Sequence, residues 1–494
     1  MAQPDESYDV VIIGAGMSGL NAAYRLQERC PGRTYTILEG REHMGGTWDL
    51  FKYPGIRSDS DLHTFGFPFR PWMQKNAIAD GHLIIQYMKD TAAEFGLDKR
   101  IQYSHKVESA DFSTKQQRWN LSVTATGTTS KHIRCQFLLL CTGYYDYHNP
   151  LDVKIPGISS FRGQVIHPQF WPSEDKLDYT NKKIVIIGSG ATAVTLLPSL
   201  THKAAHVTML QRSPSWIVAV PQSDLLSRAL RFFLPHSLAA RALRWRFYLL
   251  HWWSYTLFQR FPIWARGLLR ARAKALLPKG YPLDPNFNPK YHPWDQRLCA
   301  SPDGDFFAAI RKGKADIVTD SIQNVTEDSI QLEKSEALKP DIIVTATGLA
   351  LRIAGGCKMS VDGAAVDPAG KFVYRHAMMQ DIPNAMLFIG YVQYSWTLGS
   401  DCSALWACRL INHMAQKGWE SATPVVEGGE EELKEKPLLA LKSTYITKGG
   451  GRLPMAGDRE PWGPRKTYIK DLWEAKYSDF RELDFRRGEG YRDA

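Results

Sequence analysis

The sequence is poor in cysteine and has no arrangement of cysteines typical of a metal site or a disulfide framework. The chain of 494 residues has seven, an odd number that is widely scattered, and no C-x-x-C pair. This pattern argues against a disulfide-stapled scaffold, a structural zinc site and a dithiol reductase. We predict no metal site.

Long hydrophobic runs are also lacking. The longest nearly uncharged apolar stretch covers residues 247–258, which is short of the roughly 20 residues that span a bilayer. The first residues are polar and acidic and lead directly into an apolar strand pattern at Tyr8, so we expect no signal peptide. The prediction is a soluble cytoplasmic protein.

Excess basic charge is confined to one segment. The formal net charge is +10, and residues 221–280 alone carry it, with eleven basic side chains and one acidic. A basic surface running along the whole chain is therefore excluded, and we expect no nucleic-acid partner. The segment is rich in Leu, Arg and Trp and is predicted to be helical.

Within this segment Arg266, Arg270 and Lys274 fall one turn apart on one helix face, where like charges repel mildly. The face is either an ordinary solvated surface or a weak contact with an anionic membrane surface.

What the chain does have is one pattern, strand, glycine turn and helix, at two places. Residues 9–13 form a short β-branched run before a G-x-G-x-x-G motif that begins at Gly14. Residues 183–187 form another before a G-x-G-x-x-A motif that begins at Gly188. Such a turn lets the backbone approach a pyrophosphate and directs a helix N-terminus at its charge. Each copy predicts a dinucleotide site, the alternative being a plain glycine turn in an α/β sheet.

The next strand of each unit distinguishes the two ligands. The strand after the first turn ends in Glu39, where a carboxylate accepts hydrogen bonds from a free ribose diol. The strand after the second turn ends in Arg212, a cation suited to a 2′-phosphate, unless it is an ordinary solvated arginine. We therefore predict FAD or NAD at the first unit and NADPH at the second. Together they indicate a flavoenzyme that takes hydride from NADPH, and because a close cysteine pair is missing, molecular oxygen is the simplest acceptor.

Two more apolar strands, residues 137–143 and 341–348, end in Thr-Gly, which suits a chain passing between two nested domains. The predicted fold class is α/β, with two nested Rossmann-like dinucleotide-binding domains, for FAD and NADP, and a helical insertion. The predicted division is an FAD-binding domain over 1–147 and 381–494 including the C-terminal tail, an NADP-binding domain over 148–220 and 291–380, and a helical subdomain over 221–290.

Two longer motifs carry a family resemblance. F-x-G-x-x-x-H-x-x-x-W-P occupies residues 161–172, and G-G-T-W-x-x-x-x-Y-P-G-x-x-x-D occupies residues 45–59. Both are complete, and in them the chain resembles the Baeyer-Villiger flavin monooxygenases. It is most similar to the subgroup of the mycobacterial ethionamide-activating monooxygenase, and the resemblance covers nearly the whole chain.

The resemblance implies cofactor residues at numbered positions. The FAD residues it implies are Gly14, Gly16, Ser18, Gly19, Glu39, Thr47, Trp48, Asp59 and Val107. The NADP residues it implies are Arg57, Ser58, Gly188, Ser189, Gly190, Ala191, Thr192, Arg212 and Ser213. Many members carry Lys where this chain has Gln296, so its preference for NADPH is expected to rest more heavily on Arg212.

The resemblance also implies that Arg297 is the active-site arginine and Asp59 its partner carboxylate. In this family a flavin 4a-peroxide attacks a ketone carbonyl, and a permanently charged guanidinium favours the anions that form. Two structural alternatives stay open: Arg297 as an ion pair that only stabilises the fold, and Asp59 as the cap of the following helix. His167, in the first motif, lies in a linker, which argues against proton chemistry at its ring.

The predicted function is NADPH- and O2-dependent Baeyer-Villiger oxidation of ketones to esters or lactones, with sulfide oxidation as a side activity. The first alternative is a flavin-dependent N- or S-oxygenating monooxygenase without carbonyl insertion. The second is a nucleotide-binding protein without catalysis whose basic segment is the functional surface.

Overall fold

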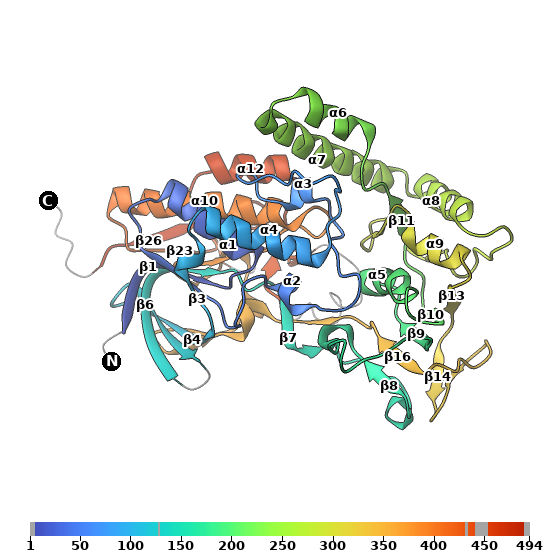
Figure 1. Ribbon diagram of the computed structural model, residues 1–494. Coiled ribbons are helices and arrows are strands. Elements are labelled where there is room, and N and C mark those ends of the chain that lie inside the picture. Colours follow the sequence, from blue (N-terminus) through green and yellow to red (C-terminus); the bar gives the residue numbers. More distant parts are fainter. Residues whose placement is uncertain (1–4, 127–128, 430–432, 440–452, 489–494) are drawn as a thin grey trace.

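Two α/β units lie side by side in the computed structural model, which describes residues 5–126, 129–429, 433–439 and 453–488 (Figure 1). Across these residues the larger sheet has eleven strands and the smaller five. Helices cover the larger sheet, and a helical arm lies along the top of both units in Figure 1. The predicted α/β fold class is confirmed.

The centre of the larger sheet is a group of buried parallel strands. Glu6–Ile13 (β1) pairs in parallel with Tyr35–Leu38 (β2) on one side and with Thr129–Leu140 (β6) on the other. Strands buried on both faces are continuously apolar, as residues 10–13 are. The remaining strands of this sheet are Ile101–Gln102 (β3), His105–Ser113 (β4), Arg118–Ala125 (β5), Lys358–Val361 (β18), Ala364–Val366 (β19), Val373–Tyr374 (β20), Met378–Met379 (β21) and Ala385–Leu387 (β22).

Helices Met17–Arg29 (α1) and Trp396–Lys417 (α10) pack against each other on the larger unit. A buried ion pair joins them, with Arg25 Nε 2.8 Å from Asp401 Oδ1. Tyr468–Tyr477 (α12) packs on the other side of α10. The other helices of this unit are Thr47–Leu50 (α2), Leu62–Phe65 (α3) and Gly81–Glu94 (α4).

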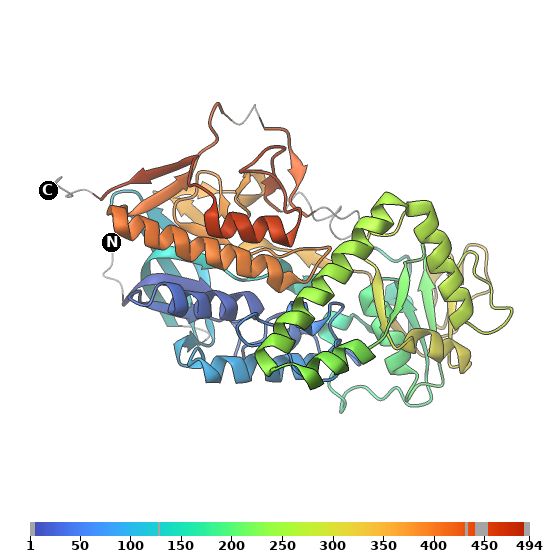
Figure 2. The ribbon, with the colours of Figure 1, turned by 90° about the horizontal axis from the view of Figure 1, so that it is seen from above.

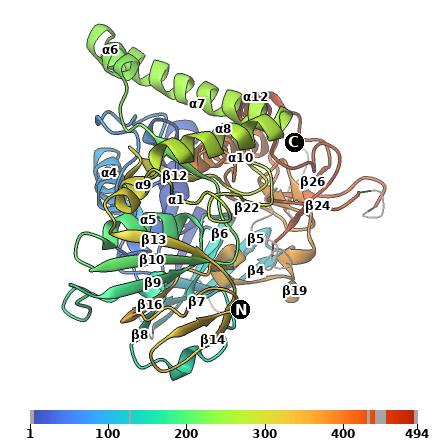
Figure 3. The same ribbon diagram turned by 90° about the vertical axis from the view of Figure 1, so that its right-hand side faces the viewer.

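The smaller sheet is parallel throughout, which is typical of a Rossmann-like unit (Figure 3). Its strands, in order across the sheet, are Ala315–Thr319 (β13), His206–Gln211 (β10), Lys183–Ile187 (β9), Ile342–Thr345 (β16) and Gln164–Ile166 (β8). Helices Ala191–Leu200 (α5) and Asp305–Arg311 (α9) pack together beside it.

The chain passes between the two units through a pair of adjacent strands. Tyr145–Pro150 (β7) leaves the larger unit and Leu349–Leu351 (β17) returns to it, and the two pair antiparallel. Both follow the Thr-Gly ends, so the predicted nesting is confirmed. The return to the larger sheet comes at β18, which pairs with β4 before the predicted boundary at residue 381. The exact division into domains stays a prediction.

The basic segment forms three helices, as predicted: Leu225–Phe233 (α6), His236–Arg260 (α7) and Pro262–Leu276 (α8) (Figure 2). Two of the three cations on the predicted face have protein partners, whereas Lys274 is exposed. Arg270 forms an ion pair with Asp284 at 2.7 Å, and Arg266 donates to Asn288 Oδ1 at 3.1 Å. In the described ranges, no helix has the combined length and apolar character needed to cross a bilayer.

The part of the chain that the structure describes has four further two-stranded pairs: Ile217–Val220 (β11) with Cys299–Pro302 (β12), Ile322–Val325 (β14) with Ile330–Leu332 (β15), Ser421–Pro424 (β23) with Leu483–Arg486 (β26), and Lys436–Pro437 (β24) with Met455–Ala456 (β25).

Candidate active site

A cavity of about 530 Å³ opens where the first glycine turn of the larger unit faces the first turn of α5. This volume lies within the range of about 300–1,000 Å³ that is usual for ligand pockets. Thirteen of the expected site residues line it: Gly14, Gly16, Ser18, Glu39, Thr47, Trp48, Arg57, Ser58, Asp59, Val107, Ala191, Thr192 and Arg297.

The first glycine turn forms one end of the cavity. Gly14 has φ +103°, and a Cβ there would stand 2.7 Å from the carbonyl oxygen of Cys141, so only glycine fits. Gly16 is the N-cap of α1, and no side chain caps this helix. The free amides at its N-terminus therefore suit the phosphates of a dinucleotide.

Glu39 closes the wall beside this turn. Its side chain is buried, and the two carboxylate oxygens accept hydrogen bonds from the backbone N–H groups of Ala15 (2.8 Å) and Arg41 (3.0 Å). Burial raises the pKa of Glu39, and these two hydrogen bonds oppose the rise. A carboxylate has about four acceptor positions, so Glu39 keeps acceptor capacity for a ribose diol.

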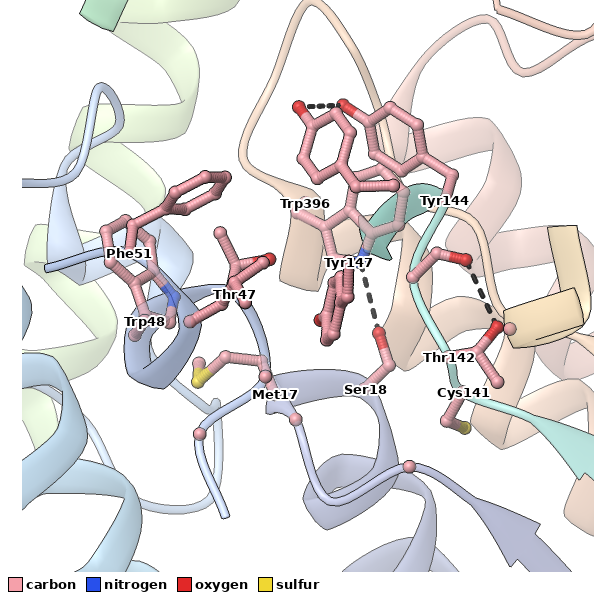
Figure 4. A pocket seen from close by; sticks show the side chains of 18 of the residues that line it. Met17, Ser18, Thr47, Trp48, Phe51, Cys141, Thr142, Tyr144, Tyr147 and Trp396 are labelled. Carbon is pink, nitrogen blue, oxygen red and sulfur yellow. Dashed lines mark hydrogen bonds between the residues drawn. The ribbon is translucent and has the colours of Figure 1, made fainter. Parts of the chain in front are cut away.

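Aromatic rings form two facing walls of the cavity (Figure 4). Trp48 and Phe51 stand on one side, and Trp396, Tyr144 and Tyr147 on the other. Trp396 Nε1 donates to Ser18 Oγ at 3.0 Å, and its ring stacks on Tyr144 at 5.0 Å between centroids. A space bounded by ring walls fits a flat aromatic system such as a flavin.

Sequence reasoning missed Tyr144, Tyr147 and Trp396. The two tyrosines come soon after the first Thr-Gly strand end, where the chain was predicted to pass between the two domains. That position was the only sequence signal for them. Trp396 begins α10, far along the chain from the glycine turn that it contacts.

Arg297 and Asp59 meet at the edge of the cavity, although they come from distant parts of the chain. Arg297 Nε lies 3.8 Å from Asp59 Oδ2, and Arg297 Nη2 donates to Ser60 Oγ at 3.1 Å. The helix-cap alternative for Asp59 is wrong, because Asp61 caps α3 by accepting from the Thr64 N–H at 2.8 Å.

Arg57 lies beside this pair and forms an ion pair with Asp305 at the start of α9. Ser58 is buried, and its hydroxyl accepts from the Ala79 N–H at 3.3 Å. Sequence reasoning missed Asp305. It also missed Arg352, which lines the cavity and whose Nη1 lies 3.6 Å from Asp146 Oδ2.

The second glycine turn lies beyond the cavity on the smaller unit. Gly188 has φ +135°, and a Cβ there would stand 2.3 Å from the Ala346 carbonyl oxygen, whereas a Cβ on Gly190 would meet no atom within 4 Å. Gly190 is the N-cap of α5, which has no side-chain cap. Ser189 Oγ donates to the Ser213 carbonyl at 2.8 Å, and the exposed Arg212 stands next to it. Gly19, Gly188, Ser189, Gly190, Arg212 and Ser213 are the expected site residues outside the cavity lining.

Two other candidates stand apart from the cavity. His167 lies outside its lining, its Nδ1 accepts from the Gln169 N–H, and burial lowers its pKa. Cys30 and Cys408 approach each other in the fold, with Cys30 Sγ 3.5 Å from the Cys408 carbonyl oxygen. Both cysteines are buried between α1 and α10, and neither lines the cavity.

The family is decided by sequence comparison. A family model described as flavin-binding monooxygenase-like matches residues 7–247. The FAD-containing monooxygenase EthA of Mycobacterium tuberculosis is 46% identical over 468 residues, covering 94% of this chain and 95% of that protein. The chain belongs to the flavin-binding monooxygenase-like family. The probable FAD-binding monooxygenase AlmA of Acinetobacter baylyi is 41% identical, covering 96% of this chain and 95% of that protein.

Solved structures confirm the fold of this flavin monooxygenase. An oxidised steroid monooxygenase bound to NADP matches with a TM-score of 0.76 at 19% identity, covering 98% of this chain and 100% of that one. Cyclohexanone monooxygenase from Rhodococcus sp. Phi1 bound to NADP+ matches with 0.74 at 16% identity and the same coverage. The family resemblance inferred from the two motifs is confirmed.

Proposed function

We propose that this flavin monooxygenase is a Baeyer-Villiger enzyme, which uses FAD, NADPH and O2 to insert one oxygen atom next to a ketone carbonyl. The product is an ester or a lactone, and sulfides are oxidised as a side reaction. The observation that carries the proposal is the Arg297–Asp59 pair at the edge of an aromatic-walled cavity.

The residues around the cavity fit FAD. The uncapped start of α1 would hold the pyrophosphate, Glu39 the ribose diol, and the two aromatic walls the flavin ring. When bound, FAD supplies the electrons, taken from NADPH, that activate O2.

The NADPH phosphates would lie at the uncapped start of α5, with Arg212 at the 2′-phosphate. Ala191 and Thr192 connect this phosphate site to the cavity, because they form the first turn of α5 and also line the cavity. The nicotinamide half would therefore enter beside Arg57 and Asp59.

Arg297 would stabilise the negative charge that develops on oxygen as the carbonyl is attacked. Its guanidinium stays charged at any physiological pH and donates in a fixed plane, so it stabilises an anion without giving up a proton. Asp59 and Ser60 hold that plane at the edge of the cavity. At 3.8 Å from Arg297 Nε, the Asp59 carboxylate is close enough to orient the guanidinium.

Product analysis tests the proposal. The FAD-loaded protein is incubated with NADPH, air and either 2-octanone or thioanisole, and products are identified by mass spectrometry. The proposal predicts an ester from the ketone together with some sulfoxide from the sulfide. Sulfoxide with no ester would identify an S- or N-oxygenating enzyme instead, and a protein that neither binds FAD nor consumes NADPH would exclude both.

A further inference from the structure

Nearly all exposed large apolar side chains of the described ranges gather on α6, α7, α8 and α12. Outside these helices and their connections they are limited to Val165, Phe170 and Val425. The three ribbon views agree that the four helices lie on one side of the molecule, the side that faces the reader in Figure 2. We call the outward surface of these helices the docking face. Single exposed apolar residues are ordinary, whereas a gathering of this kind marks an interaction surface.

The exposure is extreme at the protruding ends of the docking face. Phe232 and Phe233 at the end of α6 are 83% and 78% exposed, and Ile263 at the start of α8 is 81% exposed. Tryptophans are part of it too, with Trp253 on α7 and Trp473 on α12 more than half exposed. Trp, Phe and aliphatic side chains are those that enter the boundary between lipid headgroups and acyl chains.

Three of the four helices of the docking face carry charge of one sign, and the two acidic residues of α12, Asp471 and Glu474, are buried. Helices α6, α7 and α8 contain ten Arg or Lys residues and no Asp or Glu. Arg246 and Arg270 are neutralised by Asp224 and Asp284, which lie outside these helices. The exposed cations that remain are Arg228, Arg241, Arg260, Arg272 and Lys274.

The opposite side of α7 is already anchored to the protein body. Arg244 donates to the carbonyl oxygens of His63 and Gly66, and His251 donates to the Gln393 carbonyl at 2.7 Å. These hydrogen bonds hold the inner side of α7 to the protein body, and the exposed apolar side chains lie on its outer side.

We propose that the docking face binds the surface of an anionic phospholipid bilayer. Its aromatic and aliphatic side chains enter the headgroup boundary, and its arginines and lysines pair with lipid phosphates. A second copy of this chain fits less well, because a two-fold contact through the same surface would set cations against cations.

Vesicle co-sedimentation of the FAD-loaded full chain tests this proposal. Binding is measured with vesicles of equal parts phosphatidylglycerol and phosphatidylcholine, and with phosphatidylcholine alone, at low and high salt. We expect strong binding to the anionic vesicles that weakens with salt, and little binding to the neutral ones. Equal binding to both vesicles, or none to either, would overturn the proposal.

Two sets of variants separate the apolar and the charged contributions. The double variant Phe232→Ser/Phe233→Ser should lower partitioning about tenfold or more, since two apolar rings no longer enter the bilayer. The control variant is Val165→Ser on β8, which lies on the opposite side of the molecule. This variant should leave partitioning into the vesicles unchanged.

The triple variant Arg241→Gln/Arg260→Gln/Arg272→Gln should lower binding to anionic vesicles about fivefold for each charge removed. The control Lys154→Gln/Lys334→Gln/Lys358→Gln removes three exposed charges elsewhere and should bind nearly as the parent does. Flavin absorbance and NADPH oxidation in buffer verify that each variant is folded.

Sedimentation velocity without lipid tests whether a second copy of this chain occupies the docking face instead. A monomer supports the proposal. A dimer that Phe232→Ser/Phe233→Ser converts to monomer would assign the docking face to a second copy and overturn it.

Discussion

Arg297 is the side chain on which the proposed oxygen insertion depends most. Replacing Arg297 with Ala should leave reduction of bound flavin by NADPH working, while ester formation falls about 10²- to 10³-fold, the usual cost of losing one donor to a developing anion. Arg297→Lys keeps the charge but lacks the planar guanidinium, so its rate of ester formation should lie between those of the parent and Arg297→Ala. Stopped-flow flavin reduction and ester yield are the measurements. Ester formation at the parent rate in Arg297→Ala would leave Arg297 as a structural ion pair only.

Arg212 is the residue proposed to recognise the 2′-phosphate of NADPH. Arg212→Ala should raise the KM for NADPH about tenfold to a hundredfold, the range expected for charge-assisted hydrogen bonds, and leave the KM for NADH unchanged. Arg212→Lys should retain part of the preference. The KM values for NADPH and NADH are measured by steady-state kinetics. An equal rise in the KM for NADH would show that the effect is not specific to the 2′-phosphate.

The sequence could place some polar residues of the cavity together through a shared motif, but it gave no sign of the aromatic rings around them. Asp59 and Arg57 belong to the motif over residues 45–59, so their shared position could be inferred. Trp396 contacts Ser18 across most of the chain, and no spacing encodes such a contact. The same limit explains Cys30 and Cys408, which only the packing of α1 on α10 brings together.

The two glycines of the second turn have opposite structural requirements, which gives a matched pair of variants at the start of α5. Gly190→Ala should fold normally, because its Cβ meets no atom within 4 Å, yet it should raise the KM for NADPH by obstructing a phosphate. Gly188→Ala should destabilise the protein, since φ is +135° and the Cβ would stand 2.3 Å from Ala346 O. Thermal unfolding and NADPH kinetics are measured for both. Gly190→Ala with unchanged KM would contradict a phosphate at this turn.

The anchoring of α7 should weaken in acid. Burial lowers the pKa of His251 to about 4, below the value of about 6.5 expected in the unfolded chain. Between these values the unfolded chain binds more protons, so the stability contributed by neutral His251 is complete above pH 6.5 and is lost as the pH falls toward 4. The melting temperature of His251→Gln should therefore depend less on pH across this window than that of the parent. If the melting temperatures of the parent and His251→Gln changed with pH in the same way, the assignment of this pH dependence to His251 would be wrong.

The sequence located the elements around the glycine turns closely. Helices α1 and α5 begin at Met17 and Ala191, immediately after the second glycine of each motif, so the motif residues that follow are already helical. Strands β1 and β9 were recognisable because buried parallel strands are continuously apolar.

The nested arrangement of the two units followed from the Thr-Gly strand ends, whereas the point of return did not. β18 pairs with β4 some 250 positions away, and its short stretch, Lys358–Val361, carries no periodic signal that marks it as part of the larger sheet. Nesting matters for function because β7 and β17 run side by side between the units and hold the two glycine turns on either side of the cavity. In the proposed function, a reductant bound on the smaller unit would reach a flavin bound on the larger one.

The most direct test of this account is the fate of labelled oxygen in a single reaction. The FAD-loaded protein is supplied with NADPH, 2-octanone and 18O2, and the product is examined by mass spectrometry. The account predicts an ester that carries one 18O atom and that is lost in Arg297→Ala, in which NADPH still reduces the flavin. Consumption of NADPH and 18O2 with unchanged ketone, or an ester without label, would contradict it.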